Sequence, residues 1–404
     1  MSQLNYLEKL LDGVDVEWKP LDDISVKISS GGTPKTGVAE FYDGDIPWLR
    51  TQEVNFDEIW DTGVKITEAG VDNSSAKWIP ANCVIIAMYG ATVGKIGINK
   101  IPMTTNQACA NIQLDGNIAN YRYVFHFLLS QYEYIKSLGS GSQTNINAGI
   151  VKKLVVPIPC PNNPEKSLAI QAEIVRILDA FTAMTAELTA ELNMRKKQYN
   201  YYREKLLASE LPSSKTATLG EILDMRAGKH IKAKDISSIK NAEHKYICFG
   251  GNGSRGFVQE YSHEGDYALI GRQGALCGNV KRAKGKFYAT EHAVVCTPKE
   301  EIDIDWAFHM LTFMNLNQYK SQSAQPGLAV GNLANLTINV PTISEQRKIA
   351  KILNKFDTLT TSLQEGLPRE IELRQKQYEY YRDLLLSFPA SPAGGPKSHS
   401  DEAA

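Results

Sequence analysis

Apolar residues that recur every three or four positions mark two long segments of this chain as helices. The first stripe comprises Ile170, Ile174, Ile177, Phe181, Met184 and Leu188, and the second comprises Ile349, Ile352, Phe356, Leu359 and Leu363. A stripe this narrow is typical of a coiled-coil seam rather than of the wider face that a helix turns toward a globular core. Two such seams in one chain predict two helices that pair with each other as an antiparallel coiled coil.

The second helical segment contains a break signal at Gly366 and Pro368. Because proline lacks the backbone N–H and its ring clashes with the preceding turn, this pair predicts a kink or a break. The segments between the helices differ in pattern. Short apolar runs bounded by Gly, Asn and Pro predict strands at 83–88 and 267–271, and helical periodicity predicts helices at 121–135 and 305–319. These segments are therefore predicted to be mixed α/β.

The chain also repeats itself, most clearly in the helical segments. RKKQYNYYREKLL at 195–207 and RQKQYEYYRDLLL at 374–386 are identical at nine of thirteen positions. Weaker matches follow in the same order at nearly constant offsets of 182 to 185 residues, among them Gly90-Ala91-x-x-Gly94 with Gly274-Ala275-x-x-Gly278. Repetition at a fixed period indicates two copies of one structural unit.

The repeat predicts the domain organisation. A first globular domain covers 1–160, a central helical spacer 161–210, a second globular domain 211–342, a C-terminal helical spacer 343–388, and a tail with the composition of disorder 389–404. The N-terminal YLEKLL resembles the end of the first repeated helix, as in a circularly closed arrangement. The predicted fold is two mixed α/β domains related by a pseudo-two-fold axis and joined by two long antiparallel helices.

Composition narrows the class of protein. With 404 residues, 43% apolar and 22% charged, the chain is long enough for several domains and unlike a disordered, collagenous or membrane-bundle protein. Its six cysteines contain no Cys-x-x-Cys pair, which favours reduced thiols over disulfides or zinc. The N-terminus shows no basic segment followed by an apolar one, so we expect no secretory signal and a cytoplasmic location.

The net charge of −1 conceals an uneven distribution. Residues 1–160 carry 13 basic and 17 acidic side chains, whereas residues 211–342 carry 15 basic and 12 acidic ones. The two helical segments, with the tail, are balanced. Within the second domain, residues 281–286 hold four cations, a run that predicts either a solvated hairpin or contact with a phosphate backbone.

Three motifs suggest an enzyme, and none is complete. Gly90–Ile96 has too few residues between its glycines for a phosphate-binding loop, and Ile replaces the Ser or Thr that would hold Mg²⁺. Phe249–Gly253 matches part of a methyl-donor loop, but the catalytic tetrad of adenine methyltransferases is absent. Glu243 and Lys245 are a fragment of a metal-nuclease site without its Pro-Asp element. The glycine turns are interpreted either as tight turns alone or as sites where the backbone approaches DNA.

Residues 1–388 resemble the specificity subunit of type I restriction-modification systems. The resemblance depends on the paired QYxYYR helices, on the block EGLPREIELRQKQYEYYRDLLLSF, and on the quartet Thr185–Leu188 repeated as Thr189–Leu192. It implies that each globular domain recognises one half of a bipartite site in double-stranded DNA. It also implies that the helices hold the domains apart and bind two methylation subunits, to which motor-nuclease subunits attach.

The resemblance further implies a chain with no catalytic residue, no metal and no cofactor of its own. S-adenosylmethionine, ATP and Mg²⁺ would belong to the partner subunits. Physical reasoning agrees with this organisation, because two diverged halves suit an asymmetric split site, whereas a homodimer would require a palindrome. One added quartet would lengthen a helix by about 6 Å and rotate its end by about 40°, close to the rotation of one base pair. The rival interpretation is a coiled-coil adaptor that presents two protein-binding domains.

Candidate DNA contacts are polar side chains whose chemistry matches base edges, on loops that we expect to reach the major groove. In the first domain they are Lys35, Arg50, Thr51, Gln52, Tyr89, Thr92, Lys95, Gln143 and Asn145. In the second they are Lys229, Asn252, Arg255, Arg272, Gln273, Lys281, Arg282 and Gln325. Tyr199, Tyr202, Tyr378 and Tyr381 are interpreted either as packing residues between the helices or as a docking surface for partner subunits. His126 and His309 occupy equivalent positions and are predicted to be packing residues.

Overall fold

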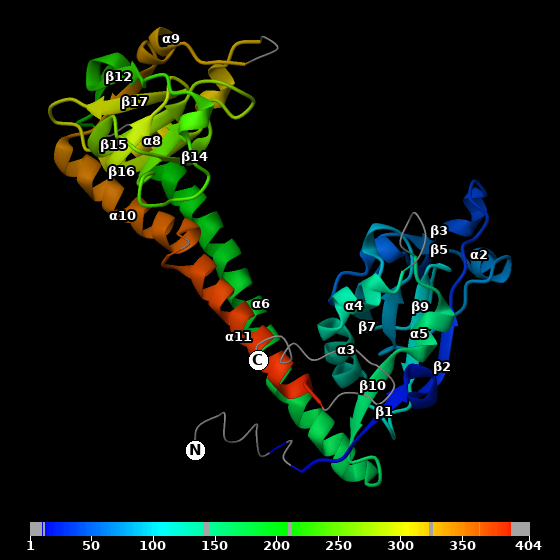
Figure 1. The fold of residues 1–404 in the computed structure, drawn as a ribbon. Coiled ribbons are helices and arrows are strands. Elements are labelled where there is room, and N and C mark those ends of the chain that lie inside the picture. Colours follow the sequence, from blue (N-terminus) through cyan, green and yellow to red (C-terminus); the bar gives the residue numbers. More distant parts are fainter. Residues whose placement is uncertain are drawn as a thin grey trace. The chain divides into compact units, whose positions relative to one another are not determined.

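The computed structural model describes Leu10 and residues 13–139, 145–208, 212–322, 326–362 and 364–388. The chain divides into two compact units, one made of residues 1–186 and 372–404 and the other of residues 187–371. Each unit therefore combines a globular domain with portions of the long helices (Figure 1). The predicted tail 389–404 and the YLEKLL segment, apart from Leu10, lie outside the described residues.

The first unit contains a five-stranded sheet in the order β2-β9-β6-β7-β4, a three-stranded sheet β5-β3-β8 and a ribbon β1-β10 among its described residues. Its strands are β1 Val16–Pro20, β2 Ser25–Ser30, β3 Tyr42–Leu49, β4 Glu58–Ile59, β5 Lys65–Ile66, β6 Val84–Ala87, β7 Ile96–Asn99, β8 Thr104–Thr105, β9 Cys109–Leu114 and β10 Val155–Pro159. Its short helices are η1 Leu21–Ile24, η2 Ala39–Phe41, η3 Thr51–Glu53, α2 Glu68–Asp72, η4 Gly90–Thr92, α3 Tyr121–Ser130, α4 Tyr132–Ser137 and α5 Ala148–Lys153. The helix predicted over 121–135 is thus two helices, separated at Gln131.

The second unit contains a six-stranded sheet in the order β12-β17-β15-β16-β13-β14 and a ribbon β11-β18 among its described residues. The strands are β11 Lys215–Thr218, β12 Leu223–Ala227, β13 Tyr246–Gly250, β14 Gly253–Val258, β15 His263–Gly271, β16 Val280–Ala289, β17 Ala293–Pro298 and β18 Thr337–Val340. The short helices are α7 Leu219–Ile222, η5 Ala233–Asp235, α8 Ile304–Phe313, η6 Leu316–Tyr319 and α9 Val330–Ala334. The helix predicted over 305–319 is therefore α8 followed by the separate 3-10 turn η6.

The two sheets share a strand order and a register, which confirms the repeat. The order β2-β9-β6-β7 in the first unit matches β12-β17-β15-β16 in the second. Val84 pairs with Ile112, and Ala268 pairs with Cys296, so both members of the pair shift by the same 184 positions. The next strand also repeats, because β4 pairs in parallel with β7 and β13 pairs in parallel with β16. Both units are mixed α/β, as predicted.

The long helices are α6 Pro164–Leu207, α10 Ile343–Thr361 and α11 Leu367–Leu386. α6 passes through both units, and each unit pairs part of it with a different helix (Figure 1). In the first unit Phe181 stacks on Tyr381 of α11 at 5.1 Å between ring centroids, and in the second Tyr199 stacks on Phe356 of α10 at 6.2 Å. Ser213, just beyond α6, donates a hydrogen bond to Glu345 near the start of α10, so these two helices are antiparallel.

The predicted break in the second helical segment is present between α10 and α11. Gly366 has a φ of +91°, and a Cβ atom at this position would lie 2.5 Å from the carbonyl oxygen of Thr358. Only glycine fits such a left-handed turn without strain. α11 begins at Leu367, with Pro368 in its first turn, where a missing N–H costs no hydrogen bond.

Each unit has its own core. In the first, the face of the sheet that carries Val84 and Ile112 packs against α3 and the start of α6 through Phe127 and Ile174. In the second, the equivalent face packs against α8, where Trp306 is fully buried. The six cysteines are all free, and burial raises the pKa of Cys83, Cys109 and Cys296 to about 12. No helix in the described ranges is both long and apolar enough to cross a bilayer.

Candidate nucleic-acid interface

The glycine turn is the same structure in both units. Gly90 and Gly94 have φ values of +81° and +80°, and their counterparts Gly274 and Gly278 both have +90°. The N–H of Gly94 donates to the carbonyl of Ala87 at 2.8 Å, and the N–H of Gly278 donates to the carbonyl of Gly271 at 2.7 Å. Left-handed backbone at both positions explains the repeated glycines. The turn exposes its first residues to solvent at one end of the sheet.

In the first unit, the structure brings three separate groups of candidates to this turn. The Thr92 hydroxyl donates to the carbonyl of Thr51 at 2.9 Å, which places η3 beside η4. The N–H of Ile146 donates to the carbonyl of Met88 at 3.0 Å, so Asn145 lies next to the same turn. Residues 50–52, 89–95 and 145 therefore form one surface.

Within this surface the cations already have partners. The Arg50 guanidinium pairs with Glu53 at 3.2 Å, and Lys95 donates to Asn55 at 2.7 Å. The side chains of Gln52 and Tyr89 are exposed. Lys35 is exposed in a separate loop that reaches the same region, because Thr33 of that loop donates to Gln107. Gln143 lies outside the described residues.

In the second unit, loops from five parts of the chain meet around the equivalent turn. The N–H of Gly274 donates to the carbonyl of Pro326 at 2.9 Å, and the N–H of Arg272 donates to the carbonyl of His292 at 2.9 Å. Asn252 accepts a hydrogen bond from Asn279 at 2.8 Å. Isolated backbone β-bridges bring in two more candidates: Lys229 pairs with Thr290, and Gln273 pairs with Gly327. Arg255 is exposed on β14, and Gln325 lies outside the described residues.

The basic run 281–286 does not act as a single patch, because it lies on β16 and its side chains alternate between the two faces of the sheet. Lys281 belongs to the loop cluster, near Gly253. Lys284 and Lys286 lie on the other face, paired with Asp266 and Glu264. Arg282 is occupied by Asp266 and Asp305 at 2.8 and 2.7 Å, with only 14% of its side chain exposed. It therefore has a structural role in this conformation.

Sequence analysis missed a polar cluster beside Arg272. One carboxylate oxygen of Glu291, Oε1, lies 2.9 Å from Nδ1 of His230 and 3.3 Å from Nε2 of His292. Among the described residues, Arg272 Nε, Glu291 Oε2 and His292 Nδ1 are buried atoms with no hydrogen-bond partner. Buried polar atoms without partners are uncommon in folded proteins, and water or a bound ligand can supply the missing hydrogen bonds.

A sequence signal for this cluster exists. The frame Thr105-x-x-Ala108 is repeated as Thr290-x-x-Ala293, and the two residues inside it differ between the copies. They are Glu291 and His292 in the second unit, and their counterparts are Asn106 and Gln107 in the first. A fixed frame around changing polar residues, next to the glycine turn, is the pattern of a recognition loop.

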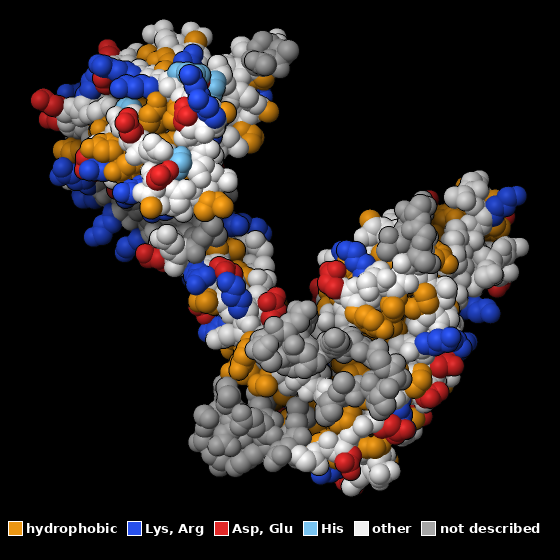
Figure 2. Space-filling view, in the orientation of Figure 1, with side chains coloured by type: hydrophobic (Ala, Val, Ile, Leu, Met, Phe, Trp, Pro, Cys, Tyr) orange, Lys and Arg blue, Asp and Glu red, His pale blue; other side chains and the backbone are white. Residues whose placement is uncertain are grey.

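The second unit also carries a cluster of positively charged side chains away from the loops around its glycine turn. One hollow there is lined by Lys240, Lys245, Arg282, Lys284 and Lys286, with Ile247, Phe249 and Phe257 as its apolar part. Lys and Arg side chains also gather on the face of this unit that Figure 2 presents. The hollow is distinct from the loop cluster that contains Lys281. No group of three or more His, Cys, Asp or Glu with metal-binding geometry occurs in the described parts of the chain.

The four helix tyrosines pack within the chain. Tyr199 is 8% exposed and stacks on Phe356, and Tyr202 stacks on the same ring at 5.6 Å while 41% of its surface stays exposed. Tyr381 stacks on Phe181, and burial raises the pKa of Tyr378 to about 12. Their neighbours Tyr201 and Tyr380 point outward instead, with 58% and 54% of their surface exposed. Packing between helices is thus observed, and docking by the four remains a prediction.

The comparison with known proteins identifies the class. A family model described as "Type I restriction modification DNA specificity domain" matches residues 13–195 and again 213–373. The chain therefore belongs to the family of type I restriction-modification specificity subunits, as the resemblance suggested, and it carries two DNA specificity domains. This match over both halves decides against the adaptor interpretation.

Particular relatives agree. The type I restriction enzyme EcoprrI specificity subunit of Escherichia coli is 50% identical over 378 residues, which cover 90% of this chain and 93% of that protein. The EcoR124I/EcoR124II specificity subunit of Escherichia coli is 36% identical over 413 residues, covering 96% and 98%. The fold matches the crystal structure of a type I restriction-modification S subunit from M. genitalium, with a TM-score of 0.65 and 18% identity over 94% of this chain.

Proposed function

We propose that this chain directs a type I restriction-modification complex to an asymmetric, bipartite DNA sequence, with each unit recognising one half. The observation that carries the proposal is that the two domains share one topology but differ in their loops. Within each domain, these differing loops come together around its own glycine turn. Equal scaffolds with unlike loops can present two unlike recognition surfaces to one duplex. In the second unit the surface includes Arg272, Gln273 and the Glu291 cluster, and in the first it includes Gln52, Tyr89 and Asn145.

Double-stranded DNA is the proposed ligand, and the charge distribution supports a division of labour on it. Side-chain amides and guanidinium groups match the hydrogen-bonding edges of adenine and guanine in the major groove. Exposed lysines contact phosphates without sequence preference. The lysine-lined hollow containing Lys245 and Lys286 supports a phosphate-binding role, whereas the loop cluster supports base recognition.

The proposal includes two methylation subunits, each bound to one of the repeated helical segments. Repeated residues that are buried are explained by packing, but Tyr201 and Tyr380 are repeated and more than half exposed. In each copy the ring packs edge-on against the next tyrosine at 5.3 Å. Two equal exposed surfaces are what two copies of one partner require. Exposed tyrosines are also frequent in the centre of protein interfaces.

We further propose that motor-nuclease subunits join through the methylation subunits, and that catalysis and its cofactors reside in those partners. In this proposal S-adenosylmethionine, ATP and Mg²⁺ bind outside this chain. The incomplete phosphate-loop and methyl-donor motifs support the assignment. Gly90–Ile96 and Phe249–Gly253 are both occupied by structural roles, a tight turn in the first case and a strand junction in the second.

The decisive experiment maps methylated adenines across a genome that encodes the partner subunits, with and without this chain. We expect a single bipartite motif with two unlike halves and a fixed spacer, present only when the chain is expressed. A palindromic motif, or an unchanged methylation pattern, would contradict the proposal.

The docking surface is tested separately with Tyr201→Ala and Tyr380→Ala. Each substitution should remove one methylation subunit from the purified complex, and the double variant should remove both, as measured by native mass spectrometry. Tyr319→Ala is the matched control, because Tyr319 is 43% exposed but lies outside the repeated helices. Full stoichiometry in the double variant would place the docking surface elsewhere.

A further inference from the structure

Each globular domain packs on its pair of long helices through contacts that the two units share. Gln171 of α6 accepts a hydrogen bond from the N–H of Asn120 at 2.8 Å, just before α3. Gln346 of α10 accepts one from the N–H of Asp303 at 2.8 Å, just before α8. The same two glutamines donate to the carbonyls of Ile118 and Glu301. We call these two contact regions the first and the second domain–helix interface.

A histidine bridge is also shared. At the first interface His126 of α3 contacts Asp179 of α6 through Nε2 at 2.8 Å and Tyr378 of α11 through Nδ1 at 3.1 Å. At the second, His309 of α8 contacts Asn354 of α10 through Nε2 at 2.7 Å and Tyr199 of α6 through Nδ1 at 3.3 Å. Both histidines are almost fully buried. The shared glutamines and histidines give the two interfaces one geometry.

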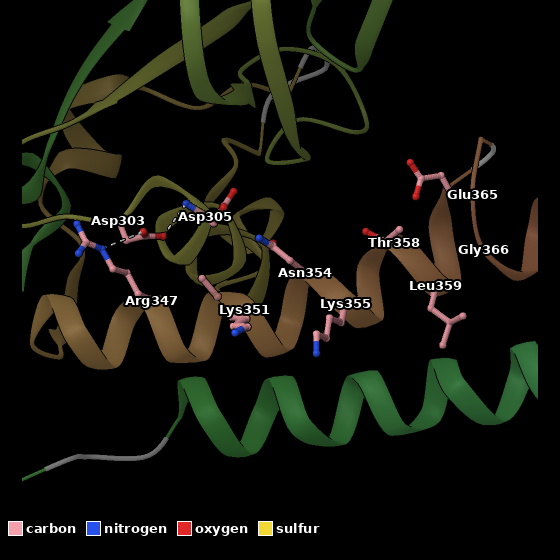
Figure 3. Close-up of a pocket in the computed structure, with 11 residues that line it drawn as sticks. Asp303, Asp305, Arg347, Lys351, Asn354, Lys355, Thr358, Leu359, Glu365 and Gly366 are labelled. Atoms are coloured by element: carbon pink, nitrogen blue, oxygen red, sulfur yellow. Dashed lines mark hydrogen bonds and ion pairs between the residues drawn. The ribbon is translucent and has the colours of Figure 1, made fainter.

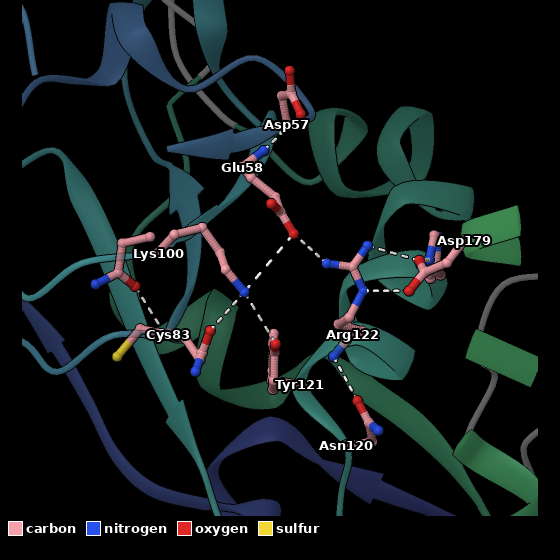
Figure 4. Close-up of polar contacts among 11 residues, drawn as sticks. Asp57, Glu58, Cys83, Lys100, Asn120, Tyr121, Arg122 and Asp179 are labelled. Atoms are coloured by element: carbon pink, nitrogen blue, oxygen red, sulfur yellow. Dashed lines mark hydrogen bonds and ion pairs between the residues drawn. The ribbon is translucent and has the colours of Figure 1, made fainter. Parts of the chain in front are cut away.

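The charges around this common frame differ. At the first interface Arg122 forms a two-pronged ion pair with Asp179, with N–O distances of 2.6 and 2.7 Å, and its other side contacts Glu58 (Figure 4). Lys100 lies 3.8 Å from the same Glu58 carboxylate. Burial alone would raise the pKa of Asp179, but hydrogen bonds from His126 and Arg122 outweigh it and hold the pKa below its ordinary value. The domain thus presents a cation to an acidic helix position.

At the second interface the signs are reversed. The position of Arg122 is occupied by Asp305, and the position of Asp179 is occupied by the neutral Asn354. Asp305 pairs with Arg282 of its own domain at 2.7 Å. On α10, Arg347 points toward Asp303 at 4.0 Å, whereas Lys351 and Lys355 line the same groove without pointing at the two aspartates, and Glu365 lines it as well (Figure 3). Here the acidic surface of the domain meets one helix cation, Arg347.

We propose that these reversed charges make each helix pair accept only its own recognition domain. The common frame alone would let either domain pack on either helix pair. If the second domain occupied the first interface, Asp305 would face Asp179, and two negatively charged carboxylates would meet. If the first domain occupied the second interface, Arg122 would face the neutral Asn354 and lose its carboxylate partner, with Arg347 nearby on the same helix. Like charges brought together in a partly buried contact destabilise it, and an ion without its partner does the same.

The inference is independent of what the domains bind, because it concerns only contacts within each unit. Its consequence is that the order of the two domains along the chain is not free. A chain with the two domains exchanged should assemble well only if the acidic and the neutral position on the helices are exchanged as well. Each helix pair would thus select its domain both by attracting the correct one and by repelling the other.

The test measures Asp179→Asn in two backgrounds of the full chain. Asn keeps the contact with the histidine, as Asn354 does in the second unit, so the substitution removes only the charge. In the native background we expect the midpoint of thermal unfolding to fall by about 3–6 °C, because Arg122 loses its ion pair. In the Arg122→Asp background, which copies the second domain, the same substitution should raise the midpoint. An effect of the same sign in both backgrounds would overturn the proposal.

Two further variants protect the test against misfolding. If the Arg122→Asp chain does not fold, Arg122→Ala replaces it, and the cost of Asp179→Asn should then shrink to less than half its native value. An undiminished cost there overturns the proposal too. At the second interface, Asn354→Asp should be tolerated better when combined with Asp305→Asn than alone. Gln171→Ala is the matched control, since the shared contact it removes should cost the same whether residue 122 is Arg, Ala or Asp.

Discussion

Comparing equivalent positions of the two units distinguishes two kinds of residue, those that are repeated and those that change. Where backbone geometry or packing decides, the residue is repeated, as with the glycines of the turn and with His126 and His309. Where a side chain faces solvent beside the turn, the residue changes, as from Gln107 to His292. The same position can thus be assigned a structural or a recognition role by comparing the chain with itself, because both copies solve the same folding problem and differ in what they contact.

Replacing Arg272 and Gln273 together by Ala should weaken recognition of one half-site only. Both residues lie in the loop cluster of the second unit, and each base contact of this kind contributes about 1–3 kcal/mol of discrimination. Genome-wide methylation mapping should show relaxed sequence preference in one half of the motif and an unchanged other half. The double variant Gln52→Ala and Tyr89→Ala should relax the opposite half. Equal loss at both halves would indicate damage to the fold instead.

The buried His309 should make the second unit sensitive to acid. Burial lowers its pKa, an effect that Arg282 reinforces and that Asn354, Asp357 and Asp305 oppose. The unfolded chain takes up a proton near about pH 6.5, whereas the folded chain resists protonation until lower pH. Stability is therefore complete above that pH and is lost as the pH falls through the lowered pKa.

Thermal unfolding between about pH 7.5 and about pH 5.5 measures this effect. The native chain should lose stability over the interval, and His309→Gln should lose less than the native chain does. His244→Gln, a substitution of a half-buried histidine on a surface loop outside the domain–helix interfaces, is the control and should keep the native pH dependence. If His309→Gln also keeps it, the acid sensitivity comes from another group.

At the scale of elements, α6 is where the two units join. The boundary between the units falls between Ala186 and Glu187, inside the repeated Thr-Ala-Glu-Leu quartets. A helix that continues through the boundary transmits any change of length as a translation and a rotation together. The second connection between the units passes through α11 near Glu372. α10 ends at Thr361, before the turn at Gly366, so α10 and α11 are two separate helices rather than one continuous helix.

Inserting a third quartet after Leu192 should therefore change the spacer of the DNA motif by about one base pair, because the insertion adds about 6 Å and about 40°. Both half-sites should stay the same, since no recognition loop is altered. Methylation mapping of the insertion variant provides the measurement. Inserting four residues at the exposed turn around Gly116, between β9 and α3, is a control that should leave the spacer unchanged. Altered half-sites in the α6 variant would contradict the role of the helix as a spacer.

Periodicity, turn residues and the repeat predicted the elements well because each reflects local physics. The Gly366 break and the strands at 83–88 and 267–271 depend on residues within one turn or one strand. The sequence did not predict that α6 contacts α11 in one unit and α10 in the other, which depends on three-dimensional packing. Nor could it show that Arg282 is held by Asp305, because nothing in a basic run reveals which cations are neutralised by residues far along the chain.

At the scale of the whole molecule, the charge is distributed in a way that affects DNA binding. The predicted first domain has a net charge of −4 and the second +3, and the remaining segments are neutral. Several of the basic side chains already form ion pairs within the chain, such as Arg50 with Glu53 and Arg122 with Asp179. Affinity for duplex DNA depends mainly on the number of phosphates that free cations neutralise. By this measure we expect the chain by itself to have little general affinity for DNA, even with its proposed sequence-recognition groups in place.

The isolated chain should therefore bind DNA weakly and with a shallow dependence on salt, while the complex with methylation subunits should bind tightly with a steep one. Each phosphate contact adds about −0.9 to the slope of log K against log salt, so the slope counts contacts. Fluorescence anisotropy with a duplex carrying the mapped motif, between about 50 and about 200 mM salt, gives both slopes. The control duplex has one half-site scrambled and should weaken binding by the complex without changing its slope much, because base contacts contribute little to salt dependence. An isolated chain that matched the complex in affinity and slope would show that its own cations, including the lysine-lined hollow, already supply the phosphate contacts.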